Sequence, residues 1–208
     1  MRIPTKTLLL LSGLLLTANP EARAVVGVGT TLNFTELPAG PVNGLSVGGV
    51  TFGFTINGLA SSDATFGSTA GPGPTTFNSP PHLEGSTLGL LMLDFASPIV
   101  FLQFGSHLSV ETDVTSALGV QLSDSSMTPL GGLLSVDMIR SPNFAGGRFE
   151  YDGPAARHAA IQFKDQAATR FTIDALTFVP VPEPMLAWLI VPALVGGIYL
   201  RRRSANRA

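Results

Sequence analysis

Residues 181–208 place the strongest constraint on how this chain can fold. The segment opens with Val181, Pro182, Glu183 and Pro184, and then has no charged residue from 185 to 200. Proline fixes its own φ angle and lacks an amide hydrogen, so the two prolines end any strand or helix that precedes them. A folded domain must therefore stop before this segment.

The apolar run 185–200 predicts a helix that spans a membrane. Sixteen residues make a helix of about 24 Å, which is short for a hydrocarbon core about 30 Å thick. Three consecutive basic residues follow the run and predict that the C-terminus stays on the cytoplasmic side; they are Arg201, Arg202 and Arg203. Everything before Pro180 is then expected on the outer side of that membrane.

The order of the Val-Pro-Glu-Pro motif, the apolar run and the arginine cluster resembles the C-terminal sorting signal of PEP-CTERM proteins. These proteins are exported by Gram-negative bacteria that make exopolysaccharide. The resemblance implies recognition by an exosortase, a membrane protease-transpeptidase that processes the chain near the Pro-Glu-Pro motif. It covers residues 180–208 and implies a destination, while the activity of the delivered domain stays open. The alternative is an ordinary C-terminal anchor without processing.

The N-terminus has the three parts of a secretory signal peptide. Arg2 and Lys6 precede an apolar stretch over residues 8–16, and Ala22 and Ala24 flank Arg23 in an A-x-A cleavage pattern. We therefore expect export through the Sec machinery and removal of residues 1–24. Both ends of the chain independently predict an exported protein.

Residues 25–179 remain as one domain with enough length for a sizeable core. From 25 to 180 the chain has twelve acidic and five basic residues, a net charge of about −7. This acidic balance argues against nucleic-acid binding. The chain contains no cysteine, which excludes disulfides, cysteine-ligated metals and thiol catalysis.

The domain is predicted to be all-β. Apolar residues alternate with polar ones in 50–56, and Gly, Pro, Ser and Asn interrupt the chain about every ten residues. We expect strands at 31–35, 50–56, 88–95, 99–105, 117–123, 132–138, 147–151, 158–163 and 169–178. The Gly- and Pro-rich stretch 58–85 is expected to be one long loop. The prediction is a two-sheet, jelly-roll-like β-sandwich between a signal-peptide helix and a transmembrane helix.

A second resemblance concerns the domain itself. Residues 34–40, 48–52, 148–151 and 171–178 are similar to the first and last strands of jelly-roll domains common in PEP-CTERM proteins. Such domains are similar in architecture to carbohydrate-binding modules. This chain departs from the pattern at Ala175, where the family often has Asn or Asp.

Glu36 and Asp174 are candidate ligands of a structural calcium ion. Related carbohydrate-binding modules hold calcium with acidic residues at the ends of their first and last strands, so the resemblance implies this role. Calcium takes six to eight oxygen ligands, so backbone carbonyls would have to contribute. The alternative is that both carboxylates cap strands or face water.

Aromatic side chains outside clear strands are candidates for glycan contact, because an aromatic ring stacks on the apolar face of a sugar. Phe66 and Phe77 lie in the predicted long loop, and Phe144 lies beside Pro142. Tyr151 is the only tyrosine between residues 25 and 180. The alternative is that these rings pack against the core.

Catalytic motifs are missing from the sequence. It has no H-x-x-x-H spacing for zinc and no G-x-S-x-G around a nucleophile. The three histidines, His82, His107 and His158, lie in unrelated sequence contexts. Two of the three aspartates Asp94, Asp137 and Asp152 would be needed for the carboxylate pair of a glycosidase, and the sequence does not give their separation.

These patterns predict a non-enzymatic protein, anchored in the inner membrane before processing and then delivered to the cell envelope or extracellular matrix. Its expected partners are the Sec machinery, an exosortase and exopolysaccharide, in a biofilm setting. Two roles stay open for the domain. It is either a structural or interaction protein of the matrix, or a glycan-binding module similar to carbohydrate-binding modules.

Overall fold

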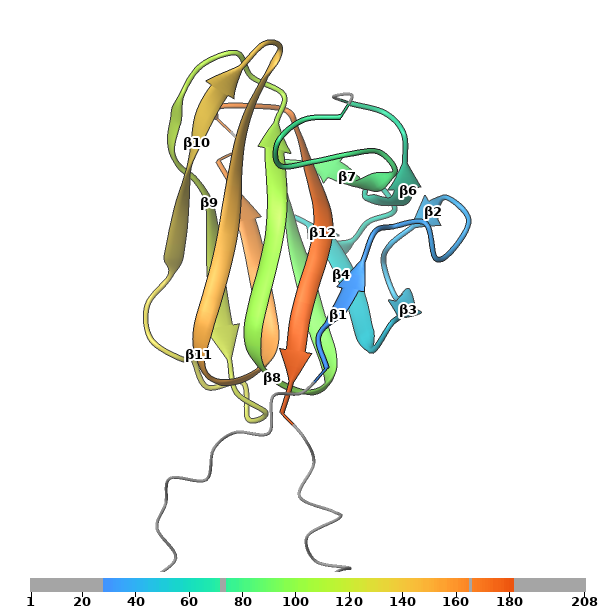
Figure 1. Cartoon of the computed structure of the whole chain (residues 1–208), viewed down its shortest axis with the longest axis vertical. Helices are drawn as coiled ribbons and strands as arrows, with labels where there is room; N and C mark the ends of the chain where they lie inside the picture. The colour runs from blue at the N-terminus through green and yellow to red at the C-terminus, as the bar shows by residue number, and fades with distance from the viewer. Residues whose placement is uncertain (1–27, 72–73, 165, 182–208) are drawn as a thin grey trace, which may run out of the picture.

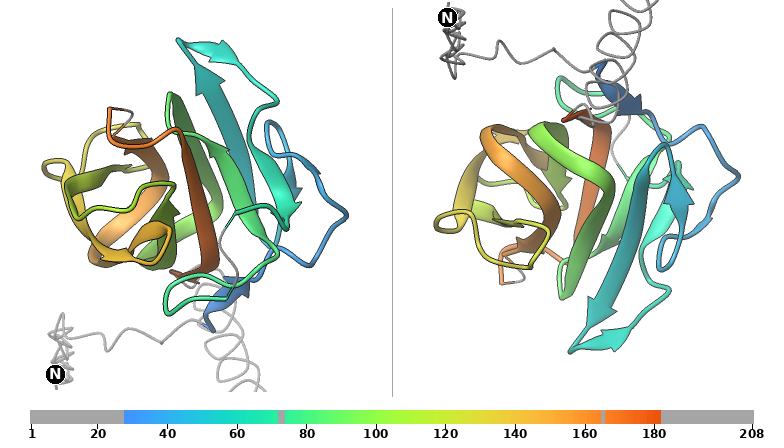
Figure 2. Two further views of the ribbon diagram at one scale, coloured as in Figure 1. Left: turned by 90° about the horizontal axis from the view of Figure 1, so that it is seen from above. Right: turned by 90° about the horizontal axis from the view of Figure 1, so that it is seen from below.

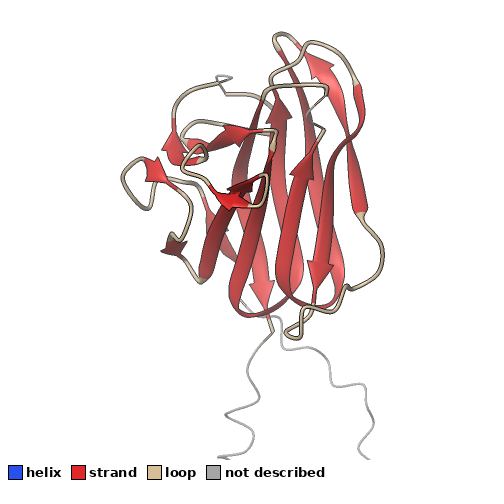
Figure 3. Cartoon of the chain, turned by 180° about the vertical axis from the view of Figure 1, so that it is seen from behind, coloured by secondary structure: helices blue, strands red, loops and turns tan. Residues whose placement is uncertain are grey.

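The computed structural model describes residues 28–71, 74–164 and 166–181. The predicted signal peptide and the predicted helix 185–200 lie outside these residues, as do Pro182, Glu183, Pro184 and the arginine cluster. All regular structure in the described part is β-strand (Figure 3). No helix long and apolar enough to cross a membrane occurs among the described residues.

Twelve strands make up the domain (Figure 1). They are β1 (Thr30–Leu32), β2 (Gly40–Pro41), β3 (Ser46–Val47), β4 (Val50–Ile56), β5 (Leu59–Ala60), β6 (Thr65–Ser68), β7 (His82–Ser86), β8 (Gly89–Leu108), β9 (Val114–Ser123), β10 (Leu134–Ser141), β11 (Phe144–Phe163) and β12 (Arg170–Pro180). All their pairings are antiparallel.

Two long strands, β8 and β11, connect the layers of the fold. They pair with each other from Leu90↔Gln162 to Leu108↔Ala145. The first half of β8 also pairs with β4 and its second half with β12, while β9 joins the second half of β11. The views along the molecule in Figure 2 show the sheet folding over on itself into facing layers. The predicted all-β sandwich is confirmed.

The predicted strand breaks near Pro98 and Pro154 are wrong, because β8 and β11 run through them. The register shifts on both sides of the Ala156↔Ile99 pair, so the ladder is irregular at this point. Such bulges accommodate residues that cannot donate a ladder hydrogen bond. The prolines therefore mark the place where the paired strands pass from one layer to the other.

The sequence located some elements well and others poorly. The predicted strand 50–56 is confirmed as β4. The predicted long loop 58–85 is wrong in part, because β5, β6 and most of β7 lie within it. The first strand ends at Leu32, since Phe34 adopts a left-handed φ of 59° and turns the chain.

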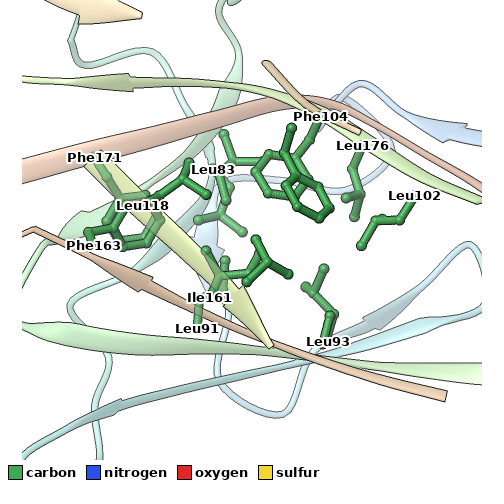
Figure 4. Close-up of a cluster of buried hydrophobic side chains, with 14 of the residues drawn as sticks. Leu83, Leu91, Leu93, Leu102, Phe104, Leu118, Ile161, Phe163, Phe171 and Leu176 are labelled. Carbon is green, nitrogen blue, oxygen red and sulfur yellow. The ribbon is translucent and has the colours of Figure 1, made fainter. Parts of the chain in front are cut away.

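The core lies between the two layers (Figure 4). Along β8, Leu91 and Leu93 are buried, whereas Leu90 and Met92, which alternate with them, are exposed, as a half-buried strand requires. Each fully buried large apolar side chain contributes about 1.5–3 kcal/mol.

Ala175 sits at an irregularity in β12. The pairing with β8 shifts register between Asp174 and Thr177, and Ala175 has a φ of 50°. A left-handed backbone is unfavourable for alanine and better tolerated by Asn, Asp and Gly. The conformation therefore suits Asn or Asp better than the alanine present here.

We predict that Ala175→Asn raises the free energy of unfolding by about 0.5–1 kcal/mol, because asparagine adopts the left-handed conformation at lower cost. Urea unfolding at pH 7 measures the change. Ala160→Gly is the matched control, since Ala160 lies in a regular part of β11. There the substitution should lower stability by about 0.5–1 kcal/mol. Destabilisation by both variants would contradict this explanation.

Candidate functional site

The outer face of the layer formed by β8, β11 and β12 is polar. Residues at alternate positions of a strand share a face, and paired residues lie side by side. The pairings Thr172↔His107, Asp174↔Gly105 and Arg148↔Gly105 therefore gather polar side chains from three strands on one surface. The opposite face of the same strands packs into the core.

Residues 74–81, between β6 and β7, lie over this polar face (Figure 1). Three contacts attach them to the sheet: Ser79 N donates to Asp174 Oδ2 (2.7 Å), Asn78 Nδ2 donates to Thr172 Oγ1, and Thr75 Oγ1 lies 2.9 Å from His107 Nε2. We call this segment the crossing loop.

Glycine in β8 allows the crossing loop to approach the sheet closely. A Cβ atom placed on Gly105 would lie 1.7 Å from the carbonyl oxygen of Phe77. On the neighbouring strand, a Cβ on Gly146 would lie 2.6 Å from the ring of His107. Any larger side chain at these positions would displace the loop or the histidine.

A pocket of about 240 Å³ lies between the crossing loop and the sheet. Its lining residues are Thr75, Thr76, Phe77, Asn78, Ser79, Gln103, Phe104, Gly105, Arg148, Asp174, Ala175 and Thr177. The pocket brings together Phe77 and Asp174, which the sequence predicted as candidates for two different sites. It adds Gln103 and Arg148, which the sequence analysis missed.

Asp174 is largely buried beside this pocket, with 8% of its surface exposed. Burial raises the pKa of its carboxyl group, and the nearby charge of Glu36 acts in the same direction. Hydrogen bonds from the backbone amides of Ser79 and Ala175, both 2.7 Å, act in the opposite direction, as does the charge of His82. The carboxylate thus fastens the crossing loop to the sheet.

Two buried histidines contact the connection between β6 and β7, His107 at Thr75 of the crossing loop and His82 at Ala70. Burial lowers the pKa of His82, whose Nε2 lies 2.6 Å from the carbonyl oxygen of Ala70. Burial, followed by the nearby His82, lowers the pKa of His107 to about 4. Both rings are therefore neutral at pH 7. Within the described part of the chain, the Nδ1 atoms of both rings and Oδ1 of Asn78 have no hydrogen-bond partner.

The predicted calcium ligands have different surroundings. Glu36 is exposed, and its Oε1 accepts the amide hydrogen of Asn33 (2.8 Å) at the turn after β1. Both carboxylate oxygens of Asp174 accept backbone amides. The described residues contain no group of three or more His, Asp or Glu side chains that could hold a metal ion. Calcium binding stays a prediction.

The other aromatic candidates lie away from the pocket. The predicted ligand role of Phe66 is wrong, because the ring is fully buried with Phe34 and Phe52 at centroid distances of 5.1 and 6.3 Å. Tyr151 is only 9% exposed, and its hydroxyl donates to the carbonyl of Pro154, so the same prediction is wrong for Tyr151. These rings fill the core.

Phe144 lies half-buried in a separate, smaller pocket of about 160 Å³ that also borders His107 and Arg170. Phe77 is therefore the aromatic candidate that the structure places in the pocket beneath the crossing loop. Its ring is half-buried, with its centroid 6.2 Å from that of His107.

The aspartates considered for a glycosidase pair lie on three different strands. Asp94, on β8, contacts Arg157 at 3.9 Å and His158 at 3.2 Å. Asp137, on β10, accepts a backbone amide hydrogen of β9 at 2.7 Å, and Asp152 lies exposed on β11. None of the three lines the pocket beneath the crossing loop.

A signal for the missed residues was present in the sequence. Gln103, Gly105 and His107 are polar or small at every second position, and the neighbouring residues Leu102, Phe104 and Leu108 are apolar. Such alternation marks one exposed or functional face of a strand. The contribution of Arg148 required the cross-strand register, which the sequence does not specify.

The buried histidines predict a pH-dependent stability. A lowered pKa means that the unfolded chain binds more protons than the folded one, so stability is full above pH 6.5 and is lost as the pH falls toward 4. For His107 the loss amounts to about 3 kcal/mol, and His82 adds to it. The raised pKa of Asp174 acts in the opposite sense, adding stability as the pH approaches 3.8.

We therefore expect His107→Gln to reduce the difference in unfolding free energy between pH 7 and pH 4 by up to about 3 kcal/mol. Urea unfolding at both pH values measures it. Ser106→Ala, which removes a buried 2.8 Å hydrogen bond to Thr172 O but no titratable group, should lower stability by about 1 kcal/mol at both. An unchanged pH dependence in His107→Gln would contradict the prediction.

Comparisons with known proteins give only distant similarities. No family model and no curated protein matches the chain. Among solved structures, a cleaved adhesin domain of Lys-gingipain from Porphyromonas gingivalis is 14% identical, with 73% of this chain and 98% of that chain covered and a TM-score of 0.45. A family 29 carbohydrate binding module is 11% identical (74% and 87% covered, TM-score 0.40). The CBM22-1 xylan-binding domain from Paenibacillus barcinonensis is 11% identical (75% and 96% covered, TM-score 0.38).

Proposed function

We propose that this chain is an exported, non-enzymatic protein whose β-sandwich binds a glycan of the cell envelope or the extracellular matrix. The observation that carries the proposal is the composition of the pocket beneath the crossing loop. Its lining combines the half-buried residue Phe77 with Gln103 and Arg148, whose side chains end in planar polar groups, and with Thr177.

This combination suits the two kinds of surface that a sugar presents. The C–H groups of a sugar ring pack against an aromatic face, and its hydroxyl groups need several hydrogen-bonding partners. Amide and guanidinium groups offer pairs of donors in one plane, which match adjacent oxygen atoms of a sugar.

The size of the pocket limits what it can enclose. Pockets that surround drug-sized ligands measure about 300–1,000 Å³, whereas this one measures about 240 Å³. We therefore propose that it holds one sugar unit, with the rest of the glycan outside. Affinity for a single unit is expected to be low, and several copies of the protein on one polysaccharide would raise it by avidity.

Export and sorting belong to the same proposal. Residues 1–24 direct Sec export, the run 185–200 anchors the chain in the inner membrane, and an exosortase processes it near Pro182–Pro184. Support comes from the end of the sandwich, because Val181 still donates to the carbonyl of Pro98 (2.7 Å) and β1 pairs with the last residues of β12. The described chain therefore begins and ends at the same end of the sandwich.

We expect Phe77→Ala to weaken glycan binding at least tenfold, because the apolar wall of the pocket is lost. Affinity electrophoresis of the full chain in gels containing exopolysaccharide from the producing cells measures binding. Phe144→Ala is the matched control, since it removes another half-buried ring that does not line this pocket. It should change binding less than twofold.

Two results would overturn the glycan proposal. One is that no exopolysaccharide fraction retards the unmodified protein. The other is that both variants bind as the unmodified protein does. Retention in the matrix without glycan affinity would then favour the structural role.

The intact mass of the protein in envelope and secreted fractions tests the sorting proposal. We expect loss of residues 1–24 and truncation near Pro182–Pro184. Substituting Glu183→Gln in the motif should leave the first cleavage unaffected and reduce the second. A mature chain that retains residues 185–208 would identify the segment as a simple membrane anchor and contradict exosortase processing.

A further inference from the structure

The pocket beneath the crossing loop holds hydrogen-bond donors, on Gln103 and Arg148, that are not used within the part of the protein that the structure describes. In the amide orientation that satisfies both groups, the oxygen of Gln103 accepts from Arg148 Nη1 (3.2 Å) and Nε (3.3 Å). A guanidinium group has five N–H donors and an amide has two, so both side chains keep donors that this contact does not use. Asp174 supplies the carboxylate of the pocket, and both its oxygens already accept backbone amides.

Arg148 also differs from Arg157 and Arg170 in its charge environment. Arg157 lies 3.9 Å from Asp94, and Arg170 contacts Asp63 (2.9 Å) and Glu84. Arg148 is exposed and forms no salt bridge within the residues that the structure describes. Its positive charge thus stands at the pocket without a carboxylate partner.

We infer that the pocket takes a sugar unit that carries a carboxylate, such as a uronic acid, and that Arg148 receives the carboxylate. This inference rests on the proposed glycan binding and specifies its ligand class. The planar guanidinium group matches a carboxylate in a two-point contact. A carboxylate only accepts hydrogen bonds, whereas each hydroxyl of a neutral sugar also donates one and so needs free acceptors.

Acidic groups around the pocket limit the strength of this interaction. Asp174 lines the pocket, Glu150 pairs with Gln103 on the same face, and Glu36 acts electrostatically on Asp174. Repulsion from more distant carboxylates is largely screened beyond about 8 Å at physiological ionic strength. The local contact with Arg148 then decides which sugar is preferred, while the acidic surroundings keep the affinity for a polyanion moderate.

The test uses the full chain and pairs of oligosaccharides that differ only in the carboxyl group. Oligomers of galacturonate, glucuronate and mannuronate are each compared with their carboxyl-reduced, neutral counterparts at 150 mM salt, by isothermal titration or affinity electrophoresis. We expect at least one acidic oligomer to bind about tenfold or more tightly than its neutral counterpart.

Arg148→Gln should abolish the preference, so that the acidic oligomer and its neutral counterpart bind this variant with equal affinity. Arg148→Lys keeps the charge but loses the planar fork, so it should retain only part of the preference. Arg157→Gln removes the same charge from the same strand, outside the pocket, and should preserve the preference. Thermal unfolding of each variant verifies that it is folded.

The outcomes separate this inference from the proposed function. Equal binding of acidic and neutral oligomers, with loss of both in Phe77→Ala, would overturn the carboxylate inference and keep glycan binding. A preference that persists in Arg148→Gln would also overturn it. Absence of binding to every oligomer and to the native exopolysaccharide would overturn both.

Discussion

The pairing of β8 with β11 over nearly their whole length is the constraint on which the remaining structure depends. Because these strands pass through both layers, their register fixes which residues face the core and which face outward in each layer. A shift by one residue would bury Gln103 and Arg148 and expose Phe104 and Phe149. The same register that builds the core therefore assembles the pocket from side chains that lie 45 residues apart in the sequence.

Holding the crossing loop on a polar face of the sheet costs folding free energy. Each buried polar atom without a partner costs about 1–3 kcal/mol, and three such atoms lie here, on Asn78, His82 and His107. Apolar side chains could have covered the sheet at lower cost. The polar contacts through Thr172 and Asp174 instead fix the loop in one position, and this position forms the wall of the pocket that carries Phe77.

Local patterns were enough to predict part of this molecule. Alternation identified β4 to the residue and the all-β class as a whole, because a strand with one buried face repeats every two residues. The breaks near Pro98 and Pro154 were wrongly placed, since a proline ends a strand only where a ladder hydrogen bond is required and a bulge removes that requirement. Phe66 was misassigned for a related reason: its strand, β6, has only four residues and lies among glycines and prolines.

Local sequence patterns could not predict the pocket, because it depends on contacts between strands that are distant in the sequence. Phe77 and Asp174 each stood out in the sequence, one as a loop aromatic and one as a strand carboxylate, but only the contact of Ser79 with Asp174 places them together. That contact also gives the carboxylate of Asp174 a structural role. With both oxygens bound to backbone amides, Asp174 positions the loop, and the charge that remains available to a ligand is the positive charge of Arg148.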